Sequence, residues 1–436
     1  MFVFLVRYLG ATASCLYLSR MSYGSKLGSL ELGTLNVTFF ISALIGSTYV
    51  TKTFGPRDSM MLGMSLVCAY SASILISDES VSGYKTFMII LGSILGGIGS
   101  GIMWTGQGVY FACICEEYRE ALIYKEDDYA YGDVDEERIP PTLEHVTSRF
   151  GAAFAAIFMA TEFIMILLSR FFLSYLKINW RPLFAIYTVV SIIAVCSMFF
   201  VEGIDRKLYL TEEDETQIFL FKEILSTWKI LSNRPSMKYF IPFNFSYSLL
   251  SRFLETFVIP QASQTTILEG DPEFFNYLLF AVSTFVGVIA CLASAYWSKL
   301  EKDIQLCLGG ASIFMISLLF MSIKSKSQWG YAFFVSIYVF YGIARASSLA
   351  SLRAIFVDKF LDDRHSAFAQ FVLQSGVGHF VGFLISENAL CQQTSTYCIK
   401  YEDKSIHNVL VIEVLMMILS IATIPSILII RRINDP

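Results

Sequence analysis

The stretch Lys85-TFMIILGSILGGIGSGIMWTGQGVY-Phe111 carries no charged residue after its first position. A helix needs about 20 apolar residues to cross roughly 30 Å of hydrocarbon, and this stretch is long enough. Because no water reaches the bilayer interior, its backbone must satisfy its own hydrogen bonds, as a helix or within a closed barrel. The apolar run is continuous rather than alternating, which favours a helix. The sequence therefore predicts an all-α protein that crosses a membrane.

Similar stretches recur along the whole chain, separated by polar loops. Charged residues make up only 16% of the 436 residues, against about 25% in soluble domains. No long basic stripe indicates nucleic acid as a partner. We expect about twelve membrane spans, at residues 2–18, 35–50, 59–76, 86–111, 150–173, 183–201, 239–259, 274–297, 304–323, 329–350, 366–385 and 408–430.

The longest charged stretch divides these spans six and six. We therefore expect an N-terminal six-helix bundle at residues 1–201, a cytosolic linker at 202–238 and a C-terminal six-helix bundle at 239–436. Within the linker, residues 210–231 are expected to form a helix on the membrane surface. With both termini in the cytosol, 19 Lys and Arg residues face the cytosol and 10 face the opposite side. This bias supports that orientation.

Two turns echo each other in the two halves. Residues 51–58, TKTFGPRD, follow the second span, and residues 298–303, SKLEKD, follow the eighth. Such correspondence is typical of a transporter built from two related halves. The six-plus-six plan with a charged central loop resembles the major facilitator superfamily. That resemblance implies a gating role for three residues of the first turn, Gly55, Arg57 and Asp58, although their order differs from the family pattern.

Three further segments carry a more specific resemblance. They are Leu32-GTLNVTFFISALIG-Ser47, Gly96-GIGSGIMWTGQGVY-Phe111 and Thr147-SRFGAAFAAI-Phe158. The second resembles the fourth-helix signature of the Unc-ninety-three-like branch of the superfamily. Members of that branch include proposed solute transporters, a regulatory subunit of a potassium channel and a trafficking chaperone for Toll-like receptors. The resemblance therefore implies a fold and leaves the activity open.

The seventh span carries polar residues on one helical face. Asn244, Ser248, Arg252 and Glu255 recur at spacings of four, four and three residues. A charge at the centre of a bilayer costs about 2.5–3.5 kcal/mol on insertion scales, so such residues usually face a bundle interior or a wet cavity. We predict that Arg252, Glu255 and Asn244 bind solute. The alternative is an Arg252–Glu255 pair that only locks two helices together.

Arg345 on the tenth span is the second candidate for solute binding. The superfamily resemblance implies that the first, fourth, seventh and tenth helices line a central pathway, which would bring Arg345 near Arg252 and Glu255. Two arginines with one carboxylate would leave an excess positive charge, suited to an anionic solute. The alternative is that Arg345 extends towards the cytosolic surface. On the fourth span, Trp104 and Gln107 are further ligand candidates because both need polar partners in a dry bundle.

Other polar residues suggest supporting roles. Glu255 and Glu162 are candidates for proton coupling, since burial raises the pKa of a carboxylate. Cys391 and Cys398 lie in the polar loop before the last span and form either a disulfide or two free thiols. The four histidines are scattered, so we expect no metal site. No nucleophile–base pair emerges, so we expect neither a cofactor nor an enzyme.

The leading hypothesis is a secondary transporter that moves a small polar or anionic solute by alternating access. The alternative is a non-transporting accessory protein that escorts or regulates another membrane protein, with its contacts on the acidic loop 116–144 or on outer loops. The expected partners are the lipid bilayer, a small-molecule solute and, in the alternative, a membrane protein. We favour the plasma membrane over an endolysosomal membrane.

Overall fold

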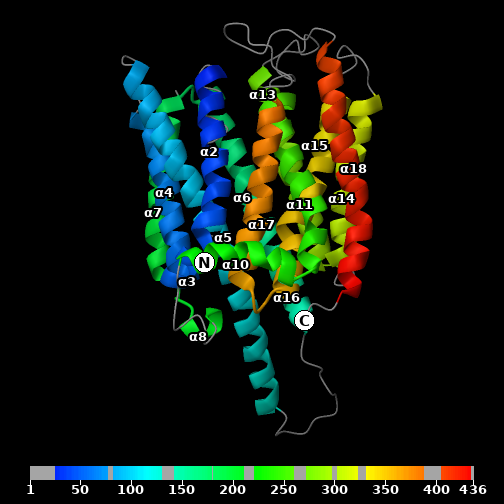
Figure 1. Cartoon of the computed structure of the whole chain (residues 1–436). Coiled ribbons are helices and arrows are strands. Elements are labelled where there is room, and N and C mark those ends of the chain that lie inside the picture. The colour runs from blue at the N-terminus through cyan, green and yellow to red at the C-terminus, as the bar shows by residue number, and fades with distance from the viewer. Residues whose placement is uncertain are drawn as a thin grey trace.

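The structure is a computed structural model that describes residues 25–76, 82–129, 142–178, 180–210, 220–259, 272–296, 302–322, 330–386 and 404–433. Nearly all of these residues are helical, and the long helices stand side by side as an upright bundle (Figure 1). The expected all-α membrane fold is therefore confirmed. The expected span 2–18 and both Cys391 and Cys398 lie outside the described residues.

The helices of the N-terminal half follow the expected spans closely. They are α2 Ser25–Ile45, α3 Ser47–Phe54, α4 Pro56–Ile76, α5 Ser82–Tyr129, α6 Leu143–Arg170 with the π-turn η1 Phe171–Tyr175, and α7 Trp180–Ser197 with η2 Met198–Phe200. Two short helices follow in the central segment, α8 Arg206–Tyr209 and α10 Leu220–Asn233.

The C-terminal half repeats this plan. Its helices are α11 Ser236–Phe253 with the π-turn η3 Leu254–Val258, α13 Pro272–Tyr296, α14 Lys302–Ser322, α15 Tyr331–Ser347 running through the π-turn η5 Ser348–Leu352 into α16 Arg353–Lys359, α17 Arg364–Leu384, and α18 Lys404–Arg432. Within the described ranges, nine helical stretches are long and apolar enough to cross a membrane, and a tenth is added if α2 and α3, bent by 58°, count as one span.

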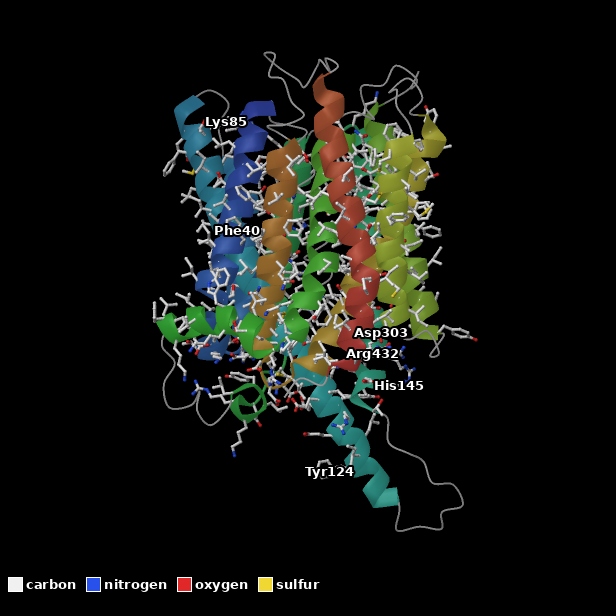
Figure 2. The ribbon with its side chains drawn as sticks, turned by 45° about the vertical axis from the view of Figure 1, so that its right-hand side comes forward. Phe40, Lys85, Tyr124, His145, Asp303 and Arg432 are labelled. Carbon is white, nitrogen blue, oxygen red and sulfur yellow. The ribbon has the colours of Figure 1, made fainter. Side chains whose placement is uncertain are left out.

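One helix, α5, extends far past the span expected from the sequence. The α5 helix continues beyond Phe111 to Tyr129 and projects below the bundle (Figure 1). Figure 2 places Tyr124 on this projection, and His145 and Arg432 near the same end of the bundle. Lys85 lies at the opposite end. We predict that the lower end in these views faces the cytosol, from the distribution of Lys and Arg in the loops.

The two halves meet where α2, α5 and α6 pack against helices of the C-terminal half. The α2 helix packs against α17, and α6 packs against α13. Within the N-terminal half, α5 packs against α2 and α4, and within the C-terminal half, α11 packs against α17 and α18. Helices α10 and α3 lie across the lower end, where α10 contacts both α3 and α17 (Figure 1). The halves are thus joined mostly by packing of apolar helix faces.

Close packing of α5 against α2 depends on Gly97. A Cβ added there would lie 2.6 Å from the carbonyl oxygen of Leu35 and 2.9 Å from the backbone nitrogen of Phe39. Both of these are backbone atoms, so a side chain could be accommodated only by moving the helices apart. Small residues at four-residue spacing serve this purpose in membrane helices.

We expect Gly97→Leu to lower the free energy of unfolding by about 1–3 kcal/mol, the usual cost of overpacking. Gly83→Leu is the matched control on the same helix, because a Cβ at Gly83 meets nothing within 4 Å. The monodisperse fraction in size-exclusion chromatography and the melting temperature in detergent measure the effect. Equal behaviour of the two variants would contradict the packing assigned to Gly97.

Candidate functional site

Arg345 lies between the two halves, near the middle of the stretch Tyr331–Lys359. Its Nη1 donates to Glu162 Oε1 on α6 at 3.1 Å, and its Nη2 donates to Glu162 Oε2. The side chains of Arg345 and Glu162 are only 11% and 7% exposed. The alternative in which Arg345 extends towards the cytosolic surface is therefore wrong. The expectation that Arg345 carries an unneutralised charge is also wrong, because Glu162 neutralises it.

Arg252 forms a second ion pair, with Glu255. Arg252 Nη1 lies 2.9 Å from Glu255 Oε2, and the two side chains are 14% and 33% exposed. The Nη2 of Arg252 also donates to Asn36 Oδ1 at 3.2 Å. Asn36 belongs to α2, so this contact also joins the two halves. Arg252 thus joins α11 to α2, as the alternative of a pair that locks two helices together expects, and solute binding by Arg252 and Glu255 stays a prediction.

The two ion pairs are separate but lie on adjacent helices. The hydroxyl groups of Ser251 on α11 and Tyr341 on α15 are hydrogen bonded at 2.9 Å. Tyr341 is close enough to Arg345 and Glu255 for both charges to act on it. The resemblance implied that Arg345 would join Arg252 and Glu255. Arg345 and Glu255 both lie near Tyr341, but the carboxylate that Arg345 pairs with is Glu162, and its role in solute binding stays a prediction.

Asn244 holds α11 against α17. Its Nδ2 donates to the carbonyl oxygen of Phe371 at 2.9 Å and to Gln374 Oε1 at 3.3 Å. Asn244 Oδ1 and Gln374 Nε2 are buried, and neither has a hydrogen-bond partner among the described residues. The site thus keeps one unsatisfied acceptor and one unsatisfied donor on neighbouring helices.

Trp104 and Gln107 both contact Arg353, a residue that the sequence analysis missed. Arg353 Nη1 donates to Gln107 Oε1. The Cζ of Arg353 lies 4.5 Å from the centre of the Trp104 ring. Arg353 was missed because the tenth span was expected to end at Ala350. Apolar residues continue after it through Val357 without glycine or proline, and this continuation was the available indication.

The turn residues Gly55, Arg57 and Asp58 contact only the N-terminal half and the segment that follows it. Gly55 has a φ of +83°, a left-handed conformation that favours glycine. Arg57 Nε lies 2.7 Å from Asp58 Oδ1, and Arg57 Nη1 donates to the carbonyl oxygen of Val201 at 3.1 Å. These contacts fix the start of α4. The gating role of the three residues stays a prediction.

Other charged residues at this end do join the two halves. Asp358 on α16 pairs with Lys302 at the start of α14, and its Oδ1 accepts a hydrogen bond from Thr147 Oγ1 of α6 at 2.7 Å. Arg364 of α17 lies 2.8 Å from Glu116 of α5. We call these five residues the latch: Glu116, Thr147, Lys302, Asp358 and Arg364. The Thr147–Asp358 and Glu116–Arg364 contacts each join a helix of the N-terminal half to one of the C-terminal half.

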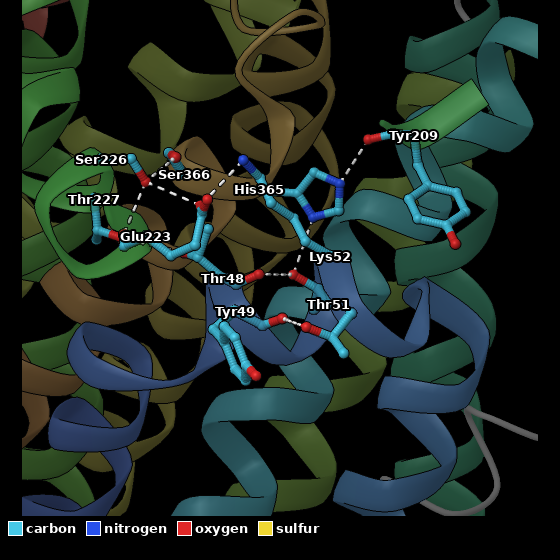
Figure 3. Close-up of polar contacts among 11 residues, drawn as sticks. Thr48, Tyr49, Thr51, Lys52, Tyr209, Glu223, Ser226, Thr227, His365 and Ser366 are labelled. Atoms are coloured by element: carbon cyan, nitrogen blue, oxygen red, sulfur yellow. Dashed lines mark hydrogen bonds and ion pairs between the residues drawn. The ribbon is translucent and has the colours of Figure 1, made fainter. Parts of the chain in front are cut away.

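Figure 3 shows a second group of polar contacts, around His365, which directly follows Arg364 of the latch on α17. The ring of His365 on α17 lies between Thr51 Oγ1, at 2.9 Å, and the carbonyl oxygen of Tyr209, at 2.8 Å. Lys52 pairs with Glu223 of α10 at 3.0 Å. The hydroxyl of Ser226, also on α10, lies 2.9 Å from that of Ser366 on α17. Helix α10 therefore fastens α3 to α17.

A family model described as Major Facilitator Superfamily matches residues 136–386. The chain belongs to the Major Facilitator Superfamily. It is accordingly an integral, multi-pass membrane protein with the fold of a transporter family. Among curated proteins, none matches the chain at a significant level.

Solved structures of the superfamily share this fold over the full length. The transporter FucP in the outward conformation is 9% identical, with coverage of 98% of this chain and 97% of FucP and a TM-score of 0.66. The human organic anion transporter MFSD10 (TETRAN) is 12% identical, with 98% coverage of both chains and a TM-score of 0.64. The proton:xylose symporter XylE is 12% identical, with coverage of 99% and 93% and a TM-score of 0.67. At these identities the likeness establishes the fold alone.

Proposed function

We propose that this protein is a secondary transporter that moves a small anionic solute by alternating access. The observation that carries the proposal is the Glu162–Arg345 ion pair, which joins α6 of one half to α15 of the other within the membrane. Ionisable residues at this depth are costly and usually mark a substrate or ion pathway. A pair that spans two halves must break or rearrange when the halves move.

The charge balance of the interior supports an anionic solute. Arg252 and Arg345 each have a carboxylate partner, Glu255 and Glu162. Arg353 has none among the described residues. The similar solved structures include proteins named as an organic anion transporter and as a proton:xylose symporter, so the fold serves both charged and neutral solutes.

Coupling to protons is part of the proposal. Protonation of Glu162 would release Arg345 and remove the bridge between α6 and α15. Glu255 is the second candidate, because its side chain is 33% exposed and so lies within reach of water. We further propose that the protein belongs to the Unc-ninety-three-like branch, with both termini in the cytosol, and that it works at the plasma membrane.

Uptake into vesicles tests this function. The purified protein is reconstituted and offered radiolabelled small carboxylates, amino acids and sugars. We expect uptake of an anionic solute, lost in an Arg252→Ala, Glu255→Ala double variant that still elutes as a folded protein. Lys222→Ala, Lys229→Ala is the control, since both lysines are exposed on α10. If no solute is taken up and a membrane protein co-purifies in a stable complex, the accessory alternative is favoured.

A further inference from the structure

Arg353 differs from the other two arginines between the halves. Its side chain is buried, with the residue 5% exposed, and no carboxylate among the described residues lies within ion-pair distance. Arg252 and Arg345 are at least as accessible and each has such a partner. A buried charge without a counter-charge is strongly unfavourable, whereas the same charge paired with an anion is tolerated. Within the part of the chain that the structure describes, Arg353 is therefore a buried arginine between the halves that has no carboxylate partner.

We propose that Arg353 binds the carboxylate group of a monoanionic solute. The inference rests on the proposed transport function and specifies its substrate class as monocarboxylates. Glu255 and Glu162 already neutralise Arg252 and Arg345, so a single carboxylate is the partner that Arg353 itself lacks among the described residues.

The hydrogen bonds of the guanidinium leave one edge available. The one hydrogen bond it makes within the described residues runs from Nη1 to Gln107 Oε1. Its Nε is buried and has no hydrogen-bond partner there. The Nε and Nη2 atoms form the edge of arginine that donates two parallel hydrogen bonds to the two oxygens of a carboxylate. Gln107 thus orients the group and leaves that edge for a ligand.

Aromatic rings hold the guanidinium in place. The Cζ of Arg353 lies 4.5 Å from the ring centre of Trp104, 5.3 Å from that of Phe154 and 5.7 Å from that of Phe371. Such contacts attract the cation but do not neutralise it. They also make the surroundings apolar, which strengthens a charge-assisted hydrogen bond to an incoming carboxylate.

The site is shared by the two halves. Trp104, Gln107 and Phe154 come from α5 and α6, whereas Arg353 and Phe371 come from α16 and α17. The π-turn η5 ends directly before Arg353. Such turns frequently occur at functional sites in helices. Because both halves contribute, binding of a carboxylate here would depend on how the halves are arranged.

Thermal stability of the purified full-length protein in detergent tests the inference without requiring transport. The probes are acetate, lactate and benzoate, each compared with its neutral amide: acetamide, lactamide or benzamide. A ligand that binds the native state raises the melting temperature with its concentration. We expect at least one carboxylate to raise it and its amide to leave it unchanged.

Variants of Arg353 decide whether this residue is responsible. We expect Arg353→Gln to abolish the carboxylate effect and Arg353→Lys to weaken it, because lysine keeps the charge but loses the two-pronged geometry. Arg149→Gln, at an exposed arginine of α6, should behave as the wild type. Without ligand, Arg353→Gln should melt at or above the wild-type temperature, since an unpaired buried charge has been removed.

Three results would overturn the inference. They are the absence of stabilisation by every carboxylate, an unchanged carboxylate effect in Arg353→Gln, and a lower ligand-free melting temperature of Arg353→Gln. Vesicle uptake separates this inference from the transport proposal. Binding that depends on Arg353 without any uptake would refute transport alone. Uptake that is unaffected in Arg353→Gln would refute the role of Arg353 alone.

Discussion

Replacing Glu162 by glutamine is expected to lower the free energy of unfolding by about 3–5 kcal/mol, the usual cost of removing one partner of a buried ion pair. Arg345 would be left as a charge only 11% exposed, held between the two halves. A Glu162→Gln, Arg345→Gln double variant should recover most of this loss, because both charges are then gone. The melting temperature in detergent, with a chemical denaturation curve, measures the change.

Glu255→Gln is the matched control for Glu162→Gln. The change is chemically the same and also removes the carboxylate partner of an interior arginine. The Glu255 side chain is 33% exposed and its partner also bonds Asn36, so solvent and the amide compensate part of the loss. We expect a clearly smaller destabilisation. Equal losses in the two variants, or a double variant no more stable than Glu162→Gln, would contradict the structural importance assigned to the Glu162–Arg345 pair.

Asp358→Asn is expected to open the latch. Asp358 and Lys302 are each 12% exposed, and Asp358 also binds Thr147 of the other half. Loss of an interaction worth about 3 kcal/mol changes the ratio of the conformation with a closed lower end to the one with an open lower end roughly 100-fold. The variant should therefore populate a state whose lower end is open to water far more often than the wild type does.

Native cysteines report this opening. Cys113 and Cys115 are both fully buried. Arg364 of the latch lies 3.3 Å from Cys113 Sγ, and Cys115 is close enough to Asp358 and Lys302 to feel their charges. We expect N-ethylmaleimide to alkylate both cysteines much faster in Asp358→Asn, as followed by mass spectrometry.

Two controls accompany the alkylation experiment. Cys291 is fully buried on α13, the charged residue that acts on it is Arg345 rather than a latch residue, and it should stay protected in the same sample. Arg431→Gln removes an ion pair with Asp303 at the same end, but Arg431 is 55% exposed, so its loss should leave alkylation unchanged. Unchanged alkylation of Cys113 and Cys115 in Asp358→Asn would show that the latch does not hold the lower end closed.

The sequence predicts the spans well because the bilayer imposes one requirement, apolar length, that is visible locally. It predicts poorly which side chains pair with each other. Such pairs depend on how helices far apart in the chain are rotated and shifted along their axes relative to one another. Glu162 and Arg345 were each recognised as buried ionisable residues, but nothing local shows that they meet. Arg353 was not considered because the tenth span was expected to end at Ala350.

Trp104 and Gln107 could be chosen as ligand candidates from the local sequence alone. An indole and an amide in an apolar run need polar partners, and this alone marked them as candidates. Their position beside a buried arginine follows from the packing of α5 against the C-terminal half. Likewise, the extension of α5 to Tyr129 was missed because the spans were predicted from apolar length. The charged residues at the end of α5 form a helix through their helix propensity, which does not require burial in a membrane.

The central claim is that the two halves move apart at the lower end of the bundle. Spin labels at His145→Cys on α6 and Asp362→Cys before α17, both exposed positions, report that separation when the nine native cysteines are replaced by serine. In lipid nanodiscs we predict two distance populations, with the longer one enriched by Asp358→Asn. A single distance, identical with and without that substitution, would contradict alternating access in this protein.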